Sequence, residues 1–184
     1  MRTLFGTKEH SNVFNLELLA ATIPLKSFCC NIEEYNEYLY KDALRSQNDH
    51  ISLTWILRER STGSIVSYMS LIADAIKLSA TEKELHNLNY PFKTIPAMKI
   101  AKLAVSQSFS EKYKGIGSFM IVAAMRKALA CNDDYCAARF LTVDADIEHD
   151  KGVLVFYEKN GFIPNAEHYN KNRKTISMRK DIYS

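Results

Sequence analysis

The chain has little of what marks several classes of protein. Its 184 residues include six glycines, four prolines and one tryptophan, and no run of about 18 apolar residues that could span a membrane. The start, MRTLFGTKEHSN, lacks the apolar centre of a secretory signal. We therefore expect a cytoplasmic protein without a membrane partner.

Cysteine is also scarce, and its spacing does not match the usual metal motifs. Cys29 and Cys30 are adjacent, which makes them a poor pair for a bridge that stabilises a fold. Cys131 and Cys136 do not complete a metal-binding pattern either. We expect reduced, mostly buried thiols and no bound metal, with a metal or redox role as the alternative.

Hydropathy and charge place the chain among globular proteins. Hydrophobic residues make up 47% of it, which suits one domain over residues 1–184. The net charge of +3 is uneven: residues 1–92 hold 9 Lys or Arg and 11 Asp or Glu, a balance of −2, and residues 93–184 hold 15 and 10, a balance of +5. The second half would favour a phosphate-bearing partner, unless these charges form an ordinary mixed surface.

The pattern of apolar runs predicts an α/β (α+β) chain whose strands form a mixed central sheet of six to seven strands, with helices on both faces. The helix that follows the first strand has a start resembling a capping box, Asn31 with Glu34 three residues later. Gly63 would turn a β-hairpin, and Gly161 would end the last helix. The predicted strands are 13–20, 51–60, 64–78, 97–105, 138–146, 161–164 and 174–182. The predicted helices are 31–47, 117–130 and 150–160, and residues 81–89 are expected to form a short helix or a turn.

A Gly-x-Gly sequence opens the helix predicted over 117–130, in the stretch EKYKGIGSFM. A Walker loop is excluded because Ser118, not lysine, follows Gly117. A dinucleotide fingerprint would need a third glycine where Met120 stands. What remains is a buried strand, a loop with basic residues, Gly-x-Gly and a helix.

Such an arrangement can hold an anion. Glycines let the backbone approach a ligand closely, and the N–H groups of a first helical turn have no partner inside the helix. Lys112 and Lys114 would add positive charge. The alternative is a helix start that needs glycine for its own conformation.

A second motif, VLVFYEKNGF, follows about 40 residues later on the next predicted helix. Together with LAVSQSFSEKYKGIGSFMI it resembles the GCN5-related N-acetyltransferase (GNAT) superfamily, and Lys112 stands where that superfamily usually has Arg or Gln. The resemblance implies a GNAT fold with a splayed cofactor strand and acetyl-CoA as co-substrate. The residues that it implies for acetyl-CoA binding are Leu103, Ala104, Val105, Lys112, Tyr113, Lys114, Gly115, Ile116, Gly117 and Ser118.

The likeness extends to one subgroup, the aminoacyl-tRNA-acetylating toxins of type II toxin–antitoxin systems. Phe28, Cys29 and Cys30 match a Phe-x-Cys segment that precedes a helix in that subgroup, and the helix here carries Ala43-Leu44-Arg45. The loop before Gly115 and the basic tail 165–180 are longer than usual there. Asp150 replaces a frequent Asn and would act as a helix N-cap.

In the superfamily the acceptor amine attacks the thioester directly, and the resemblance gives Tyr157 the role of general acid toward the leaving thiolate. A tyrosine phenol, with a pKa of about 10, is protonated at neutral pH and can donate its proton. A core aromatic is the alternative for Tyr157. His149 and His168 are weaker candidates for a base, and Trp55 and Tyr68 are expected in the hairpin core or in the wall of an acceptor pocket.

The leading hypothesis is therefore an N-acetyltransferase that acts on aminoacyl-tRNA as a toxin, with a cognate DNA-binding antitoxin and a possible homodimer. A GNAT for a small-molecule or protein amine, or a non-catalytic acetyl-CoA-binding module, are the alternatives. Phosphate contacts need only positive charge at the right place. The candidates for contacts to tRNA are Lys41, Arg45, Lys99, Lys102, Lys171, Arg173 and Lys174.

Overall fold

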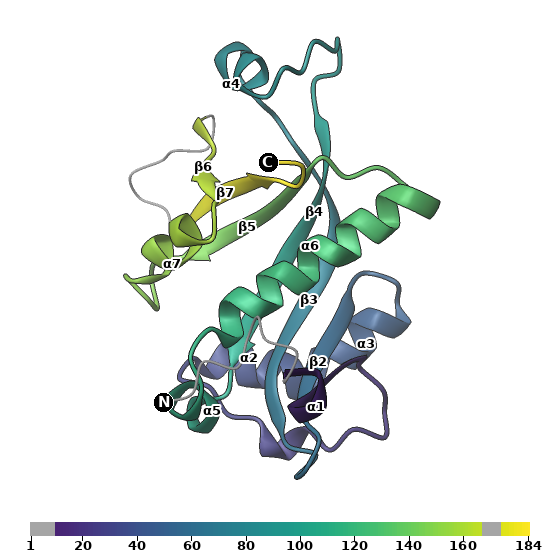
Figure 1. Cartoon of the computed structure of the whole chain (residues 1–184), viewed down its shortest axis with the longest axis vertical. Coiled ribbons are helices and arrows are strands. Elements are labelled where there is room, and N and C mark those ends of the chain that lie inside the picture. Colours follow the sequence, from purple (N-terminus) through teal and green to yellow (C-terminus); the bar gives the residue numbers. More distant parts are fainter. Residues whose placement is uncertain (1–9, 167–173) are drawn as a thin grey trace. The chain divides into compact units, whose positions relative to one another are not determined.

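The computed structural model describes residues 10–166 and 174–184 (Figure 1). The chain divides into two compact units, one made of residues up to Ile72 together with Ala101–Ala123, the other of Ala73–Ile100 and Ala124–Ser184. The tail residues Lys171 and Arg173, with His168, lie outside the described residues. No helix within the described ranges is long and apolar enough to cross a membrane.

The described residues form a seven-stranded mixed sheet in the order β1-β2-β3-β4-β5-β7-β6 (Figure 1). This confirms the predicted mixed sheet of six to seven strands, and each predicted strand has its counterpart. The strands are β1 (Phe14–Leu18), β2 (Leu53–Glu59), β3 (Ile65–Ile76), β4 (Ile95–Val105), β5 (Phe140–Asp146), β6 (Ile163–Pro164) and β7 (Thr175–Asp181).

The helices follow the predicted order with additions. One continuous helical segment, 33–48, has a π-helical turn, η2, in its middle, and the short helix α5 occupies what the sequence predicted as a loop. The helices are α1 (His10–Val13), η1 (Leu25–Ser27, a 3₁₀ turn), α2 (Glu33–Glu37), η2 (Tyr38–Asp42), α3 (Ala43–Asn48), α4 (Ala80–Leu85), α5 (Gln107–Lys112), α6 (Ile116–Asp134) and α7 (Val153–Lys159).

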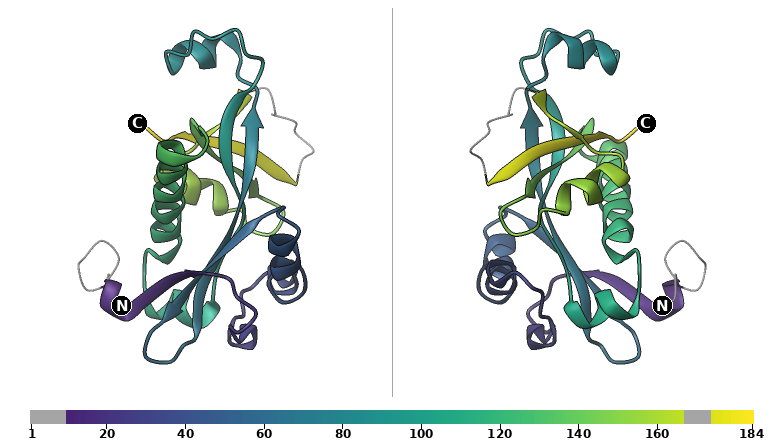
Figure 2. Two further views of the ribbon diagram at one scale, coloured as in Figure 1. Left: turned by 90° about the vertical axis from the view of Figure 1, so that its right-hand side faces the viewer. Right: turned by 90° about the vertical axis from the view of Figure 1, so that its left-hand side faces the viewer.

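In the first unit, β1 and β2 pair antiparallel and β2 forms the predicted hairpin with β3. Gly63 turns the hairpin with φ +71°, a conformation that glycine adopts without steric cost. Figure 2 shows the helical segment 33–48 on one side of β2 and the first part of β3. Its apolar side chains, such as Leu39, are buried there against Phe28, Ile56 and Tyr68.

The predicted Asn31 cap is wrong. The N-cap of α2 is Ile32, and no side chain caps the helix. The side chain of Asn36 instead accepts from the Cys30 N–H at 2.8 Å and donates to the Cys30 carbonyl at 3.0 Å. The chain that enters the helix is thus held by Asn36, a residue within α2, rather than by an N-cap side chain.

In the second unit, the first part of β4 pairs parallel with β5, and β5 and β6 each pair antiparallel with β7. Helix α4 begins with a capping box between Ser79 and Glu82. Glu82 also accepts from Nη1 of Arg179 at 2.6 Å, and Arg179 is only 1% exposed. A buried ion pair therefore ties α4 to β7.

The cysteines correct one prediction. All four are free, but Cys29 and Cys136 are exposed and the other two are half-buried, so the expectation of mostly buried thiols is wrong. The Sγ atoms of Cys131 and Cys136 lie 3.3 Å apart where α6 ends. The hydrogen bond from the Cys136 N–H to the Cys131 carbonyl, 2.9 Å long, folds the chain back at this point.

Candidate functional site

The end of β4 carries the first of the predicted acetyl-CoA residues. Ala104 is buried in the core of the first unit, and its carbonyl accepts from Oγ of Ser67 at 2.7 Å. Because successive side chains of a strand point to opposite faces, Leu103 and Val105 point to the face opposite Ala104. Their main chain is therefore held in place by the core while their side chains stay outside it.

Helix α5 follows, and its last residue, Lys112, is anchored. Its Nζ lies 2.9 Å from Oε1 of Glu59 on β2 and 4.9 Å from the centroid of the Tyr113 ring. Glu59 is 5% exposed and also accepts from Oγ1 of Thr62 at 2.9 Å. The ion pair thus fixes the end of α5 to the hairpin.

The ion pair between Lys112 and Glu59 shifts the pKa values of both groups. The hydrogen bond from Lys112 to Glu59 raises the pKa of the Lys112 ammonium above its usual value. Burial pushes the pKa of Glu59 upward, but hydrogen bonds from Lys112 and Thr62 and the lysine charge outweigh it and leave the pKa below its usual value. Both groups are charged at neutral pH.

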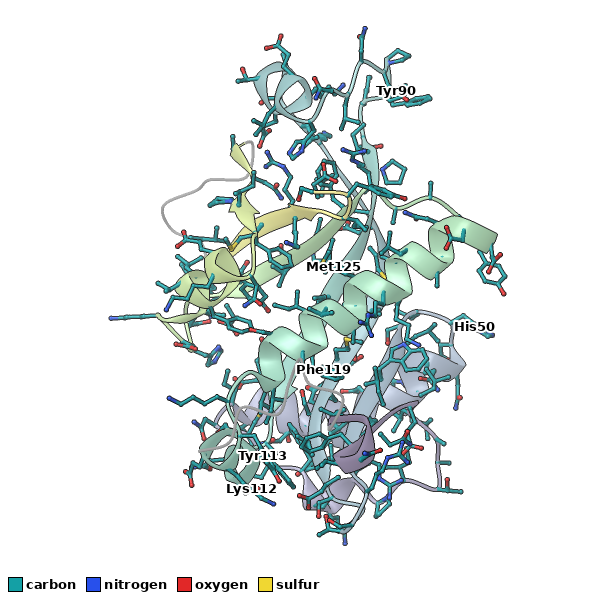
Figure 3. The ribbon with its side chains drawn as sticks, viewed as in Figure 1. His50, Tyr90, Lys112, Tyr113, Phe119 and Met125 are labelled. Carbon is teal, nitrogen blue, oxygen red and sulfur yellow. The ribbon has the colours of Figure 1, made fainter. Side chains whose placement is uncertain are left out.

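Tyr113 fixes the loop between α5 and α6. It is 8% exposed, and its ring meets Phe14 edge-on with centroids 5.3 Å apart and stacks on Phe109 at 6.4 Å. Figure 3 shows Lys112 and Tyr113 together at the end of α5, with Phe119 on the following helix. The aromatic contacts of Tyr113 position the backbone that leads into the Gly-x-Gly sequence. Lys114, which lies between Tyr113 and Gly115, is exposed.

Gly115 and Gly117 play different parts in the start of α6. Gly115 has φ +86°, and its carbonyl accepts the first helical hydrogen bond from Phe119 N–H at 2.9 Å, so it is the N-cap. At Gly115 the helix start therefore needs glycine for its own backbone conformation, which was the alternative interpretation of the motif. Gly117 lies in the first helical turn and is not one of the positive-φ glycines. Its backbone does not require glycine, which favours the close-approach reading there.

The first turn of α6 offers backbone donors. The N–H groups of Ile116, Gly117 and Ser118 precede the first residue that can bond within the helix, and they point along its axis. Ile116 is 2% exposed and anchors this turn in the core, while Gly115 and Lys114 beside it are exposed. Among the residues that the structure describes, none accepts a hydrogen bond from these three N–H groups. A fixed helix start with such donors and an exposed approach fits a diphosphate.

Tyr157 lies in the second unit, on α7. It is 6% exposed, and its ring packs edge-on against Phe156 and Phe162 with centroids 5.0 and 5.3 Å away. Gly161 ends the helix as predicted, with φ +83°. The Gly161 N–H donates to the Glu158 carbonyl at 2.9 Å, and the Phe162 N–H donates to the Tyr157 carbonyl at 3.0 Å. These two hydrogen bonds form a Schellman motif.

The turn before α7 departs from the prediction. The N-cap of α7 is Gly152, not Asp150. Asp150 stands two residues before this N-cap, and its Oδ1 accepts from the Gly152 N–H at 2.7 Å. Nδ1 of His149 lies 2.8 Å from Oδ2 of Asp146. Burial raises the pKa of Asp146, but its hydrogen bonds with His149 leave that pKa below its usual value.

The structure separates the predicted tRNA contacts into two groups. Carboxylates pair with Lys41, Lys99 and Lys174, through Glu37, Asp144 and Glu148 respectively. Within the described ranges, Lys102 and Arg45 pair with no carboxylate. Of the two predicted hairpin aromatics, Tyr68 is fully buried in the core and Trp55 is half-buried.

All ten predicted acetyl-CoA residues therefore fall in the first unit, on β4, α5 and α6 and in the loop between α5 and α6, and Tyr157 falls in the second. Sequence reasoning missed Glu59, because the residue that holds Lys112 stands 53 positions away from it. It also missed the tyrosines under Lys102. Among the residues that the structure describes, no three His, Cys, Asp or Glu side chains gather as a metal site would need.

Comparisons with known proteins support the fold. No family model matches the sequence, and no curated protein sequence matches it. Solved structures do match. AtaT complexed with acetyl-methionyl-tRNAfMet is 22% identical, with a TM-score of 0.74 over 89% of this chain and 93% of that one.

Two further structures agree. A tyrosine-to-phenylalanine mutant of KacT is 17% identical, with a TM-score of 0.74 over 91% of this chain and 95% of that one. A structure described as a bacterial toxin is 13% identical, with a TM-score of 0.77 over 93% and 92%. The chain thus has the fold of these toxins, which confirms the predicted fold class.

Proposed function

We propose that the chain is an acetyl-CoA-dependent N-acetyltransferase that acetylates the α-amine of aminoacyl-tRNA and acts as the toxin of a toxin–antitoxin pair. The observation that carries the proposal is the start of α6. Gly115 caps the helix, and Gly117 stands in its first turn although its backbone does not require glycine. We infer that its lack of a side chain serves the close approach of an anion.

The structurally similar proteins support the same activity. AtaT was solved with acetyl-methionyl-tRNAfMet, and AtaTR was solved with acetyl-CoA. An AtaT mutant was solved with the C-terminus of the antitoxin AtaR, and KacTA was solved with DNA. For this chain we propose the same classes of ligand: acetyl-CoA, an aminoacyl-tRNA and a DNA-binding antitoxin.

The residues of the first unit fit acetyl-CoA. The N–H groups of the first turn of α6 would bind the diphosphate, with Lys114 supplying charge at the exposed approach. The main chain of Leu103–Val105 would pair with the pantetheine arm as an added strand does, and its N–H groups would polarise the thioester carbonyl. Lys112 contributes by fixing the loop through Glu59.

The acceptor needs little help from a base. A free α-amine has a pKa of about 7.7–8.0, and an aminoacyl ester lowers it further by withdrawing electrons. Such an amine is largely neutral at neutral pH and can attack the thioester carbon directly. Tyr157 would donate its phenolic proton to the departing thiolate, and the proton that the acetylated nitrogen loses would restore the phenol, directly or through solvent.

The test is to incubate the purified chain with radioactive acetyl-CoA and total aminoacylated tRNA, and to locate the label after nuclease digestion. We expect label on the aminoacyl-adenosine fragment. Tyr157→Phe keeps the ring packing and should lose most of the transfer while still binding acetyl-CoA. Phe156→Tyr places a phenol on the neighbouring residue of α7 and serves as the matched control.

A second measurement follows growth after induced expression in a bacterial host. Wild-type expression should arrest growth, and Tyr157→Phe should not. If charged tRNA takes no label and expression is harmless, the proposal is wrong. Transfer to free amines alone would assign the chain to the small-molecule alternative.

A further inference from the structure

Lys102 occupies an unusual position on β4. Its Nζ lies 4.4 Å from the ring centroid of Tyr35 and 6.0 Å from that of Tyr38, both on the helical segment 33–48. Lys102 and Ala104 are two residues apart on one strand, so their side chains share a face. Ala104 is in the core that this helical segment covers. Lys102 therefore leaves the strand at the edge of that core, beside the helix.

Lys102 has no acidic partner among the described residues. In the described part of the chain no carboxylate forms an ion pair with it, whereas Lys41 and Lys99 each have one. Ring faces attract an ammonium through their electron density but carry no net charge. Lys102 is thus held in a fixed place by aromatic rings with its full charge available to an anion.

The tyrosines beneath it are themselves fixed. The hydroxyl of Tyr38 lies 3.2 Å from Oγ of Ser52, and its ring stacks on that of Tyr68 with centroids 6.3 Å apart. The Tyr68 hydroxyl donates to the Tyr35 carbonyl at 2.8 Å. Tyr38 is also the first residue of the π-helical turn η2, a feature that is frequent at functional sites.

We propose that Lys102, seated on Tyr35 and Tyr38, binds a backbone phosphate of the tRNA acceptor end. The inference rests on the proposed function and adds a specific contact to it. Lys102 directly precedes Leu103–Val105, the strand residues assigned to the thioester arm of acetyl-CoA. The diphosphate of acetyl-CoA is assigned to the start of α6, so we assign the phosphate at Lys102 to the acceptor, and the KM for acetyl-CoA distinguishes it from the 3′-phosphate of the coenzyme.

The experiment compares Lys102→Met, which keeps the length of the stem and removes the charge, with Lys102→Arg, which keeps the charge. Lys26→Met removes an exposed lysine of the same unit and is the matched control for net charge. The dissociation constant of the full-length protein for aminoacyl-tRNA is measured by fluorescence anisotropy over a range of KCl concentrations. The KM for aminoacyl-tRNA and the KM for acetyl-CoA are measured separately.

One lost contact to a single-stranded phosphate lowers the slope of log affinity against log salt by about 0.7, which is roughly a fourfold loss of affinity at 0.15 M salt. We expect this change in slope and a similar rise in the KM for aminoacyl-tRNA in Lys102→Met. The KM for acetyl-CoA should not change. Lys102→Arg should keep the wild-type slope, as should Lys26→Met.

A merely structural role for Lys102 would leave the salt slope unchanged, and that result would overturn the inference. A rise in the KM for acetyl-CoA with unchanged tRNA binding would also overturn it, because the phosphate would then belong to the coenzyme. If the wild-type protein transfers acetyl to tRNA while Lys102→Met behaves like it, only this inference fails. If the wild-type protein neither binds nor labels tRNA, the proposed function fails with it.

Discussion

Gly115 and Gly117 stand one residue apart, yet a side chain at each would have different consequences. Gly115 needs a left-handed backbone, which costs an ordinary residue about 1–2 kcal/mol. Gly117 lies in a helical turn, where alanine is favoured over glycine by up to about 1 kcal/mol. Alanine should therefore destabilise the fold at Gly115 but not at Gly117.

We predict that Gly115→Ala lowers the free energy of unfolding by about 1–2 kcal/mol because of its positive φ. Gly117→Ala should leave that free energy unchanged or raise it slightly, and should weaken acetyl-CoA binding because a methyl group enters the anion approach. Urea denaturation and isothermal titration with acetyl-CoA measure the two effects. Unchanged binding in Gly117→Ala would mean that no ligand approaches this turn closely.

At the scale of elements, two cysteine thiols lie close together at the end of α6, and we expect them to form a disulfide on oxidation. The Sγ atoms of Cys131 and Cys136 are 3.3 Å apart, and neither thiol is buried. The S–S distance of a disulfide is about 2.05 Å, so the two sulfurs would have to approach each other by roughly 1.2 Å. The hydrogen bond with Cys131 raises the pKa of the Cys136 thiol, so we expect formation to be slow at neutral pH.

We predict that glutathione disulfide oxidises this pair. The two thiols lose two protons and two electrons, a Cys131–Cys136 bond forms, and the oxidant leaves as two glutathione thiols. Intact-mass analysis should show a species lighter by two hydrogens, and peptide mapping should place the bond. Cys131→Ser should abolish it, whereas Cys29→Ser should not. A bond that maps to Cys29 or Cys30 instead would contradict the prediction.

Elements were predictable where their signal is local. The β2–β3 hairpin follows from two runs rich in strand-forming residues joined at Gly63, and the end of α7 follows from Gly161 alone. The prediction from Asn31 was wrong because this good capping residue stands one position before the actual N-cap, Ile32. The two hydrogen bonds between Asn36 and Cys30 hold the chain that enters the helix instead. Helix α5 was missed because its six residues are too few for a clear period.

The candidate site was likewise predictable only where its signal is local in the sequence. Its glycines and its tyrosine come from motifs that are contiguous in sequence. The contacts that position them come from distant residues, such as Glu59 for Lys112 and Tyr35 for Lys102, and no periodicity in one sequence reports such pairs. The site's chemistry is thus local in the chain, and its rigidity depends on contacts between distant segments.

At the scale of the whole molecule, several carboxylates with lowered pKa values should make stability depend on pH. In Glu59 and Glu82 burial acts to raise the pKa, but hydrogen bonds and nearby positive charge leave it below the usual 4.5. In Asp146 and Asp181 burial is likewise outweighed by hydrogen bonds, and the pKa lies below the usual 3.8. The unfolded chain therefore binds more protons than the folded one at acid pH.

We predict that the free energy of unfolding is constant near neutral pH and falls as the pH drops below 4.5 and then 3.8, through the lower folded-state values. Glu82→Gln tests one contribution, because it leaves the buried Arg179 without its carboxylate. The variant should lose roughly 3–5 kcal/mol at pH 7, the usual cost of breaking a buried ion pair.

The difference between Glu82→Gln and the wild type should shrink as the pH falls, since the wild-type Glu82 then takes up a proton and loses the same ion pair. Urea denaturation at pH 7, 5 and 3 measures this narrowing. Glu84→Gln changes an exposed residue of the same helix, and its stability curve should follow that of the wild type. A difference for Glu82→Gln that stays constant across this pH range would show that the charge of Glu82 does not support the contact between α4 and β7.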